Sequence, residues 1–185
     1  MKFSAFWKTY SREIAKLLTT HFALAVFSIL CCSVFLITEY TATMKLLSIV
    51  ATVFIFAFYY YLVRSQMWNL GAKDKLSAEG GRIRLNSFTG LYLGLLASIP
   101  SFIVNIVYII SSTYRDYAEF KNLFSVFTCI ELIWDAHAIG LRLLTGSPYA
   151  YLAASVLPAL FAGLAYYLGT KEWSLFRHKK QKNNL

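Results

Sequence analysis

The chain has 185 residues, of which 58% are hydrophobic and 15% charged, and its formal net charge is +9. Soluble domains usually have about 45–50% apolar and about 25% charged residues, so this composition excludes an ordinary soluble domain and indicates a single membrane domain. The three cysteines are an odd number, and they predict no disulfide framework.

Residues 1–20 predict an amphipathic helix at the membrane surface. Their apolar side chains recur at spacings of three and four, as on one face of a helix, and the basic side chains lie away from that face. Such a helix lies along the membrane with its apolar side in the headgroup boundary. We therefore expect an N-terminal interfacial helix, which ends before the first membrane span.

Four apolar stretches predict transmembrane helices, since about 20 mostly apolar residues cross a hydrocarbon core of about 30 Å. These are residues 22–37, 46–63, 91–110 and 149–168. The expected fold is an all-α integral membrane protein with a bundle of four transmembrane helices. Small residues at four-residue steps predict close packing, between these helices or with a partner. The packing residues are Gly90, Gly94 and Ser98, and Ser155, Ala159 and Gly163.

The distribution of Lys and Arg predicts that both termini are cytoplasmic. Fourteen of the 18 lie in residues 1–20, 64–87 and 169–185, and the other four lie in the remaining parts of the chain. Because positive residues collect on the cytoplasmic side, residues 64–87 are expected to be a cytoplasmic loop and residues 169–185 a basic cytoplasmic tail. The expected location is the plasma (cytoplasmic) membrane. The positive charge then reflects topology, and no nucleic-acid partner is expected.

The longest hydrophilic stretch, WNLGAKDKLSAEGGRIR, falls in this loop. Its glycines do not have the spacing of a P-loop or of a dinucleotide fingerprint. Basic residues beside a membrane attract anionic lipid headgroups, and the glycines predict a defined turn. We expect a surface here for lipid headgroups or a protein partner, formed by Trp68, Lys73, Asp74, Lys75, Arg82 and Arg84.

Residues 111–148 predict an extracytoplasmic segment, whose helix is amphipathic on the outer face or re-entrant. Charged residues in its second half make a complete span costly. In a continuous helix Glu131, Asp135 and Arg142 would share one face. With Asn105, the strongly polar residue of the third span, they form a candidate polar site for a cation, a proton or a polar solute. The alternative is a solvated polar face.

No catalytic, metal-binding or cofactor motif is recognisable. His21, His137 and His178 fall in different parts of the predicted topology, and no Cys or His pair has metal-ligand spacing. We therefore expect no catalytic residue, no cofactor, no metal and no enzymatic activity. The expected role is an accessory or structural subunit of a membrane complex, with a protein partner or a second copy of the chain. The alternative is a transport component for an ion or small solute.

The region Met67–Ile106 also carries a resemblance. It contains W-N-L-G-A-K-D-K, then G-G-R, then T-G-L-Y-L-G-L-L-A-S-I-P-S-F. This pattern resembles small multi-pass membrane proteins of Gram-positive bacteria whose function is uncharacterised. The resemblance implies a bacterial plasma-membrane protein, and it brings no substrate or catalytic residue.

Overall fold

The computed structural model describes residues 3–37 and 41–171, and 87% of these residues are helical. The helices are α1 (Phe3–Ile37), α2 (Ala42–Glu79), α3 (Thr89–Thr113), α4 (Ala118–Trp134), α5 (Ile139–Thr145), α6 (Tyr149–Ala154) and α7 (Leu157–Thr170), with a 3-10 turn, η1 (Ala136–Ala138). No strand occurs in these two ranges, which confirms the predicted all-α fold. The predicted tail extends outside the described residues at positions 172–185.

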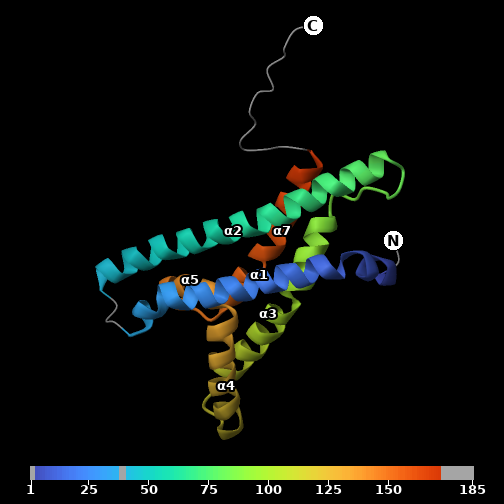
Figure 1. Cartoon of the computed structure of the whole chain (residues 1–185). Coiled ribbons are helices and arrows are strands. Elements are labelled where there is room, and N and C mark those ends of the chain that lie inside the picture. The colour runs from blue at the N-terminus through green and yellow to red at the C-terminus, as the bar shows by residue number, and fades with distance from the viewer. Residues whose placement is uncertain (1–2, 38–40, 172–185) are drawn as a thin grey trace.

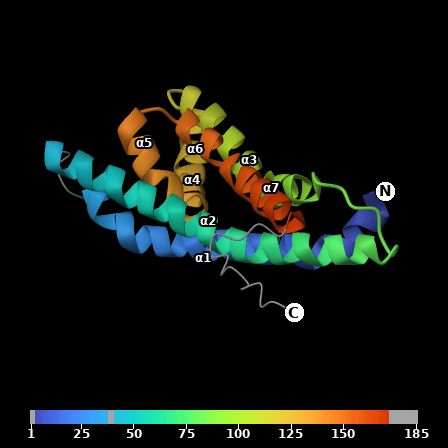
Figure 2. The ribbon, with the colours of Figure 1, turned by 90° about the horizontal axis from the view of Figure 1, so that it is seen from above.

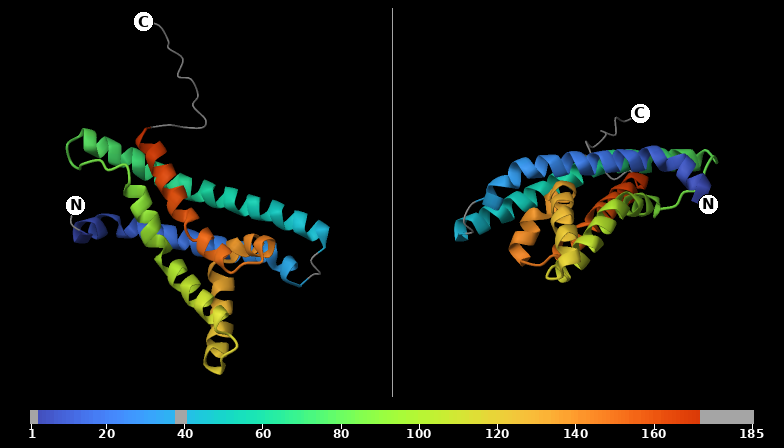
Figure 3. Two further views of the ribbon diagram at one scale, coloured as in Figure 1. Left: turned by 180° about the vertical axis from the view of Figure 1, so that it is seen from behind. Right: turned by 90° about the horizontal axis from the view of Figure 1, so that it is seen from below.

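The helices form a long antiparallel pair and a second group that diverges from it. Helices α1 and α2 lie side by side, and α3 and α4 project away from them (Figures 1 and 3). Helix α7 packs between α2 and α3. Seen from above, the start of α1 lies near the connection between α2 and α3 (Figure 2).

Four helical stretches in the described residues are long and apolar enough to cross a membrane. They are α1, α2, α3 and the α6–α7 stretch, and each contains one of the predicted spans. The last of these is divided between Ala154 and Leu157, and Pro158 follows within the first turn of α7. A proline is tolerated there because the first N–H groups of a helix have no partner within it.

Helix α1 passes without a break through the predicted junction between an interfacial helix and a span. Residues 18–22 contain neither Gly nor Pro. Its buried side chains continue at steps of three and four through this point: Tyr10, Ile14, Leu17, His21, Leu24 and Ser28. The prediction that the helix of residues 1–20 ends before the first span is therefore wrong, and its buried face packs inside the bundle.

Helix α2 also continues beyond its predicted end at residue 63. Residues 64–79 are helical, so the predicted loop is wrong over this range, and the turn begins only at Gly80 and Gly81, where Gly81 has a φ of 69°. The segment is rich in good helix formers such as Gln, Met, Leu, Ala, Lys and Glu. Its buried stripe also continues, through Val63, Met67 and Asp74. A helix does not have to end where its apolar residues do.

The outer segment is two helices rather than one. Helix α4 ends at Trp134, and the η1–α5 stretch leaves at 86° to it. This geometry fits either a broken span or a re-entrant hairpin. The re-entrant form is one of the two alternatives that the sequence predicts for residues 111–148.

The bundle exposes many large apolar side chains and buries several polar ones beside its apolar core. Leu30, Val53 and Ile103 are 74%, 64% and 58% exposed, as side chains facing lipid would be. Buried polar residues include His21, Ser101, Asn105, Glu131, Asp135 and His137. In a membrane, ionisable side chains in the interior of a bundle are costly and usually mark a functional site.

Candidate functional site

The centre of the bundle is occupied by the turn between α4 and α5. Residues 135–140, which we call the tip, are all buried, and η1 contacts α1, α2 and α6. Gly140 lies so close to Thr52 and Ser48 of α2 that a Cβ at this position would overlap the Thr52 side chain. A glycine therefore lets the hairpin approach α2 closely.

Three ligand-type side chains meet at the tip. His21 comes from α1, Asp135 directly follows the last residue of α4, and His137 belongs to η1. One nitrogen or oxygen atom from each lies within 4.8 Å of the others. His21 Nε2 is 3.4 Å from Asp135 Oδ1, and all three residues are at most 5% exposed. We call these three residues the tip cluster.

Neighbouring helices hold two members of the cluster in place. Asn105 Nδ2 of α3 donates a hydrogen bond to Asp135 Oδ2 at 2.8 Å, and another to Ser155 Oγ at 2.7 Å. His21 Nδ1 is hydrogen bonded with the Tyr59 hydroxyl of α2 at 2.9 Å. The orientation of both side chains is therefore set by groups outside the cluster.

The cluster also contains buried polar atoms that have no hydrogen-bond partner within the described residues. These are both ring nitrogens of His137 and Oδ1 of Asp135. The His137 ring instead meets the edges or faces of aromatic rings, Tyr59 at 5.5 Å and Phe56 at 5.9 Å between centroids. A buried polar group without a partner costs about 1–3 kcal/mol. These atoms of His137 and Asp135 are therefore available to bind a ligand in the cluster.

A second charged group lies one helical turn away. Glu131 is fully buried, and its Oε2 is 3.9 Å from Arg142 Nη1. The Arg142 guanidinium lies 5.3 Å from the ring centroids of both Tyr108 and Tyr151, at cation–π distance. Its side chain is 35% exposed, so this pair connects the buried interior with the surface of the bundle.

The four residues of the predicted polar site lie in these two neighbouring groups. Asn105 hydrogen-bonds Asp135, and Glu131 faces Arg142. Arg142 reaches Glu131 because the chain bends after α4, and Asn105 comes from α3. The prediction that Glu131, Asp135 and Arg142 share one face of a continuous helix is therefore wrong. His21 and His137 were missed as site residues. The sequence feature that could have identified these two histidines is an ionisable residue within or beside an apolar stretch.

The residues predicted to form a surface for lipid headgroups or a partner are not all exposed. Asp74 is buried, and its Oδ2 accepts hydrogen bonds from the hydroxyls of Tyr10 at 2.8 Å and Tyr166 at 2.9 Å. It therefore joins α1, α2 and α7, and its assignment to an exposed surface is wrong. We call these three residues the Asp74 cluster.

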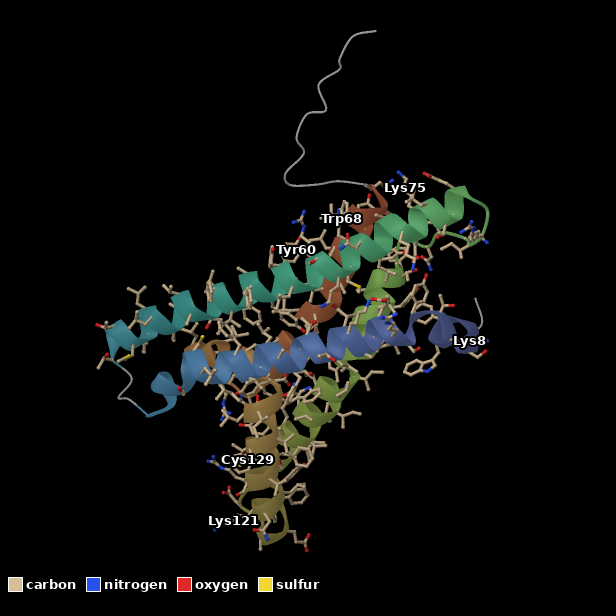
Figure 4. All side chains as sticks on the ribbon, viewed as in Figure 1. Lys8, Tyr60, Trp68, Lys75, Lys121 and Cys129 are labelled. Atoms are coloured by element: carbon tan, nitrogen blue, oxygen red, sulfur yellow. The ribbon has the colours of Figure 1, made fainter. Side chains whose placement is uncertain are left out.

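The other members of that predicted set lie on α2 and on the connection between α2 and α3. Lys75 pairs with Glu79 at 3.7 Å. Lys75 and Trp68 both lie on the C-terminal half of α2 (Figure 4). Lys73 is exposed. Arg82 and Arg84 line a groove of about 1190 Å³ between the start of α1 and the α2–α3 connection. A shared surface for these five residues therefore stays a prediction.

The predicted packing residues lie between α3 and α7. A Cβ on Gly94 would be 2.5 Å from Ala159 Cα, and a Cβ on Gly90 would overlap Tyr166. Gly163 faces Leu91, while Ser98 and Ser155 are buried. Small residues let the two backbones approach closely. These positions are thus used within the chain.

The fold and the site together define an all-α helical bundle that has four membrane-length apolar helices and a polar cluster at its centre. Comparisons with protein-family models, with curated proteins and with solved structures find no match to this chain.

Proposed function

We propose that the protein is a transport component that binds a cationic solute at the tip inside the membrane. The observation that carries this proposal is the buried tip cluster, in which Asp135 and two histidines face one another. Transporter sites are commonly formed where membrane helices are interrupted. The 86° bend between α4 and α5 is such an interruption.

Charge supports a cation rather than an anion. Glu131 and Asp135 are both fully buried, and Arg142 is the basic side chain that pairs with Glu131. Asp135 has no Lys or Arg within ion-pair distance in the described ranges. The C-terminal end of α4, which carries partial negative charge, lies beside the same carboxylate. Within the described ranges, Asp135 therefore offers a cation a carboxyl group that pairs with no Lys or Arg.

The location and orientation belong to the same proposal. We place the protein in the plasma membrane of a bacterium, with both termini in the cytoplasm, on the basis of the Lys and Arg distribution. Lys8 and Lys75 lie toward one end of the molecule and Lys121 lies toward another (Figure 4). In this orientation α4 and α5 form a re-entrant hairpin, which enters the membrane from the outer side and returns to that side.

The test is charge movement in liposomes. Purified protein, reconstituted and adsorbed to a solid-supported membrane, is exposed in turn to Na⁺, K⁺, methylammonium, Mn²⁺ and Zn²⁺. We expect a transient current with at least one of these cations and its loss in Asp135→Asn. Asp116→Asn, whose side chain is 94% exposed, is the matched control and should retain the current. No current with any cation, or an unchanged current in Asp135→Asn, would refute transport through this site.

The accessory or structural subunit, which is the first expectation from the sequence, is the second proposal. Part of its support was the small-residue faces, and α3 and α7 use these faces on each other. A separate sample tests it: extraction of the native membrane in mild detergent should recover a stoichiometric partner or a homo-oligomer. A monomer that carries the cation current by itself would contradict this role.

A further inference from the structure

We propose that the tip cluster is a binding site for a divalent transition-metal ion of the Zn²⁺ class, with His21, Asp135 and His137 as its ligands. This inference rests on the proposed cation site and names the ion that occupies it. Two imidazoles and one carboxylate are a ligand set that suits such ions, whereas Ca²⁺ and Mg²⁺ prefer oxygen ligands. A set of three protein ligands also leaves a fourth position open for water or another ligand.

The spacing of the ligand atoms fits one ion after a small closure. Two ligands about 2.1 Å from a tetrahedral metal ion lie about 3.4 Å apart. His21 Nε2 and Asp135 Oδ1 are 3.4 Å apart already. The three ligand atoms lie within 4.8 Å of one another, so binding of one ion requires the His137 nitrogen to move closer to the other two ligands.

The surrounding hydrogen bonds are those that metal ligands require. A histidine that binds a metal through one nitrogen usually donates the other N–H to a neighbouring acceptor. His21 Nε2 lies 3.1 Å from the Trp134 carbonyl oxygen and exchanges this contact for the ion, while its Nδ1 N–H donates to the Tyr59 hydroxyl, 2.9 Å away. Asn105 holds Asp135 Oδ2, so Oδ1 is the oxygen that faces the cluster. Two of the three ligands are thus oriented by a second layer of side chains.

An ion also accounts for two of the three unsatisfied atoms of the cluster. Both ring nitrogens of His137 and Oδ1 of Asp135 are buried without a hydrogen-bond partner in the described part of the chain. A dry apolar surrounding makes such atoms costly unless something binds them. Coordination satisfies one His137 nitrogen and the Asp135 oxygen at the same time. A purely structural role for His137 leaves both nitrogens unexplained.

Direct metal binding in detergent tests the inference. The protein is purified with a histidine-free affinity tag and with His178→Gln throughout, so that His21 and His137 are the histidines under test. After removal of metals with a chelator, Zn²⁺ is added, excess ion is removed and the metal content is measured. We expect one Zn²⁺ per chain, a higher melting temperature with Zn²⁺, and visible absorption bands of a low-symmetry N/O site when Co²⁺ replaces it.

Variants separate coordination from folding. His137→Phe keeps a ring among aromatic neighbours and removes the ligand, so it should fold without binding Zn²⁺ stoichiometrically and without the Zn²⁺-dependent rise in melting temperature. Tyr59→Phe keeps all ligands and should weaken binding by about 10–100-fold. Glu13→Gln, on α1 but away from the tip, should bind as the parent protein does. Absence of stoichiometric Zn²⁺ and Co²⁺, or full binding by the folded His137→Phe protein, would overturn the metal site.

The two proposals fail separately. Currents with Na⁺, K⁺ or methylammonium that depend on Asp135, without stoichiometric Zn²⁺ binding, leave a cation transporter and remove the metal site. Stoichiometric Zn²⁺ that depends on His137, without any cation current, leaves the metal site and removes transport.

Discussion

The Asp74 cluster offers a quantitative test of how the helices are held together. In Asp74→Ala, the hydroxyls of Tyr10 and Tyr166 lose the carboxylate oxygen that accepts both of their hydrogen bonds. A hydrogen bond to a charged group contributes about 1.5–3 kcal/mol in soluble proteins, whereas polar contacts within membranes average about 0.6 kcal/mol. Asp74 is 7% exposed and lies in the hydrophilic part of α2, so an intermediate value is appropriate. We expect a total loss of about 2–4 kcal/mol.

The assay is thermal unfolding in detergent. For a chain of this size, about 1 kcal/mol shifts the melting temperature by about 2–4 °C, so Asp74→Ala should lower it by about 4–16 °C. Asp74→Asn keeps one acceptor oxygen and should lose about half as much. The control is Tyr61→Phe on the same helix, where the ring is 64% exposed and a negligible change is expected. If Asp74→Ala melted within 2 °C (an approximate limit) of this control, the reasoning from these two hydrogen bonds would be refuted.

Three further predictions concern packing, topology and charge. Gly94→Ala places a Cβ 2.5 Å from Ala159 Cα and should destabilise the α3–α7 contact by about 1–3 kcal/mol, measured by thermal unfolding. In a cysteine-free protein, cysteines at the exposed positions Lys121 and Gly146 should be labelled from the same side of the membrane if α4 and α5 form a re-entrant hairpin. Arg142→Ala leaves Glu131 buried without its counter-charge and should cost about 3–5 kcal/mol, which a second change, Glu131→Gln, should partly restore.

Each of these has its own control. Gly163→Ala brings a Cβ only to 3.2 Å from Leu91 Cβ, so it should cost less than the change at Gly94; an equal cost contradicts the packing argument. Labelling of the two cysteines from opposite sides would show that α4 and α5 are one broken span. For the charge pair, a double variant no more stable than Arg142→Ala would mean that Glu131 does not need its partner.

The sequence predicted the apolar helices well, because each is a long run of side chains suited to lipid. It failed at helix ends. The junction expected near residue 21 and the loop expected from residue 64 both assumed that a helix stops where its hydropathy changes. The stripe of buried residues crosses both points instead. Helix continuity depends on backbone hydrogen bonds and packing, which hydropathy does not report.

The site was only partly predictable for a different reason. Glu131, Asp135 and Arg142 are close in sequence, so local spacing suggested their association. His21 is brought to them by the packing of α1 against the tip, and no spacing rule links positions that distant. Residues 134–138 contain no Gly or Pro, so the 86° bend that brings His137 into the bundle could not be predicted from local sequence. Such long-range contacts depend on the tertiary arrangement.

The continuity of α2 has a consequence for the shape of the protein outside the lipid. With 38 residues at about 1.5 Å each, the helix is about 57 Å long. Even at a tilt of about 40°, it rises about 44 Å, against a hydrocarbon core of about 30 Å. At least about 14 Å of the helix therefore lies beyond the hydrocarbon, shared between its two ends. Because Asp74 is held by two other helices, the end of α2 that carries Lys73 has a fixed direction relative to the bundle.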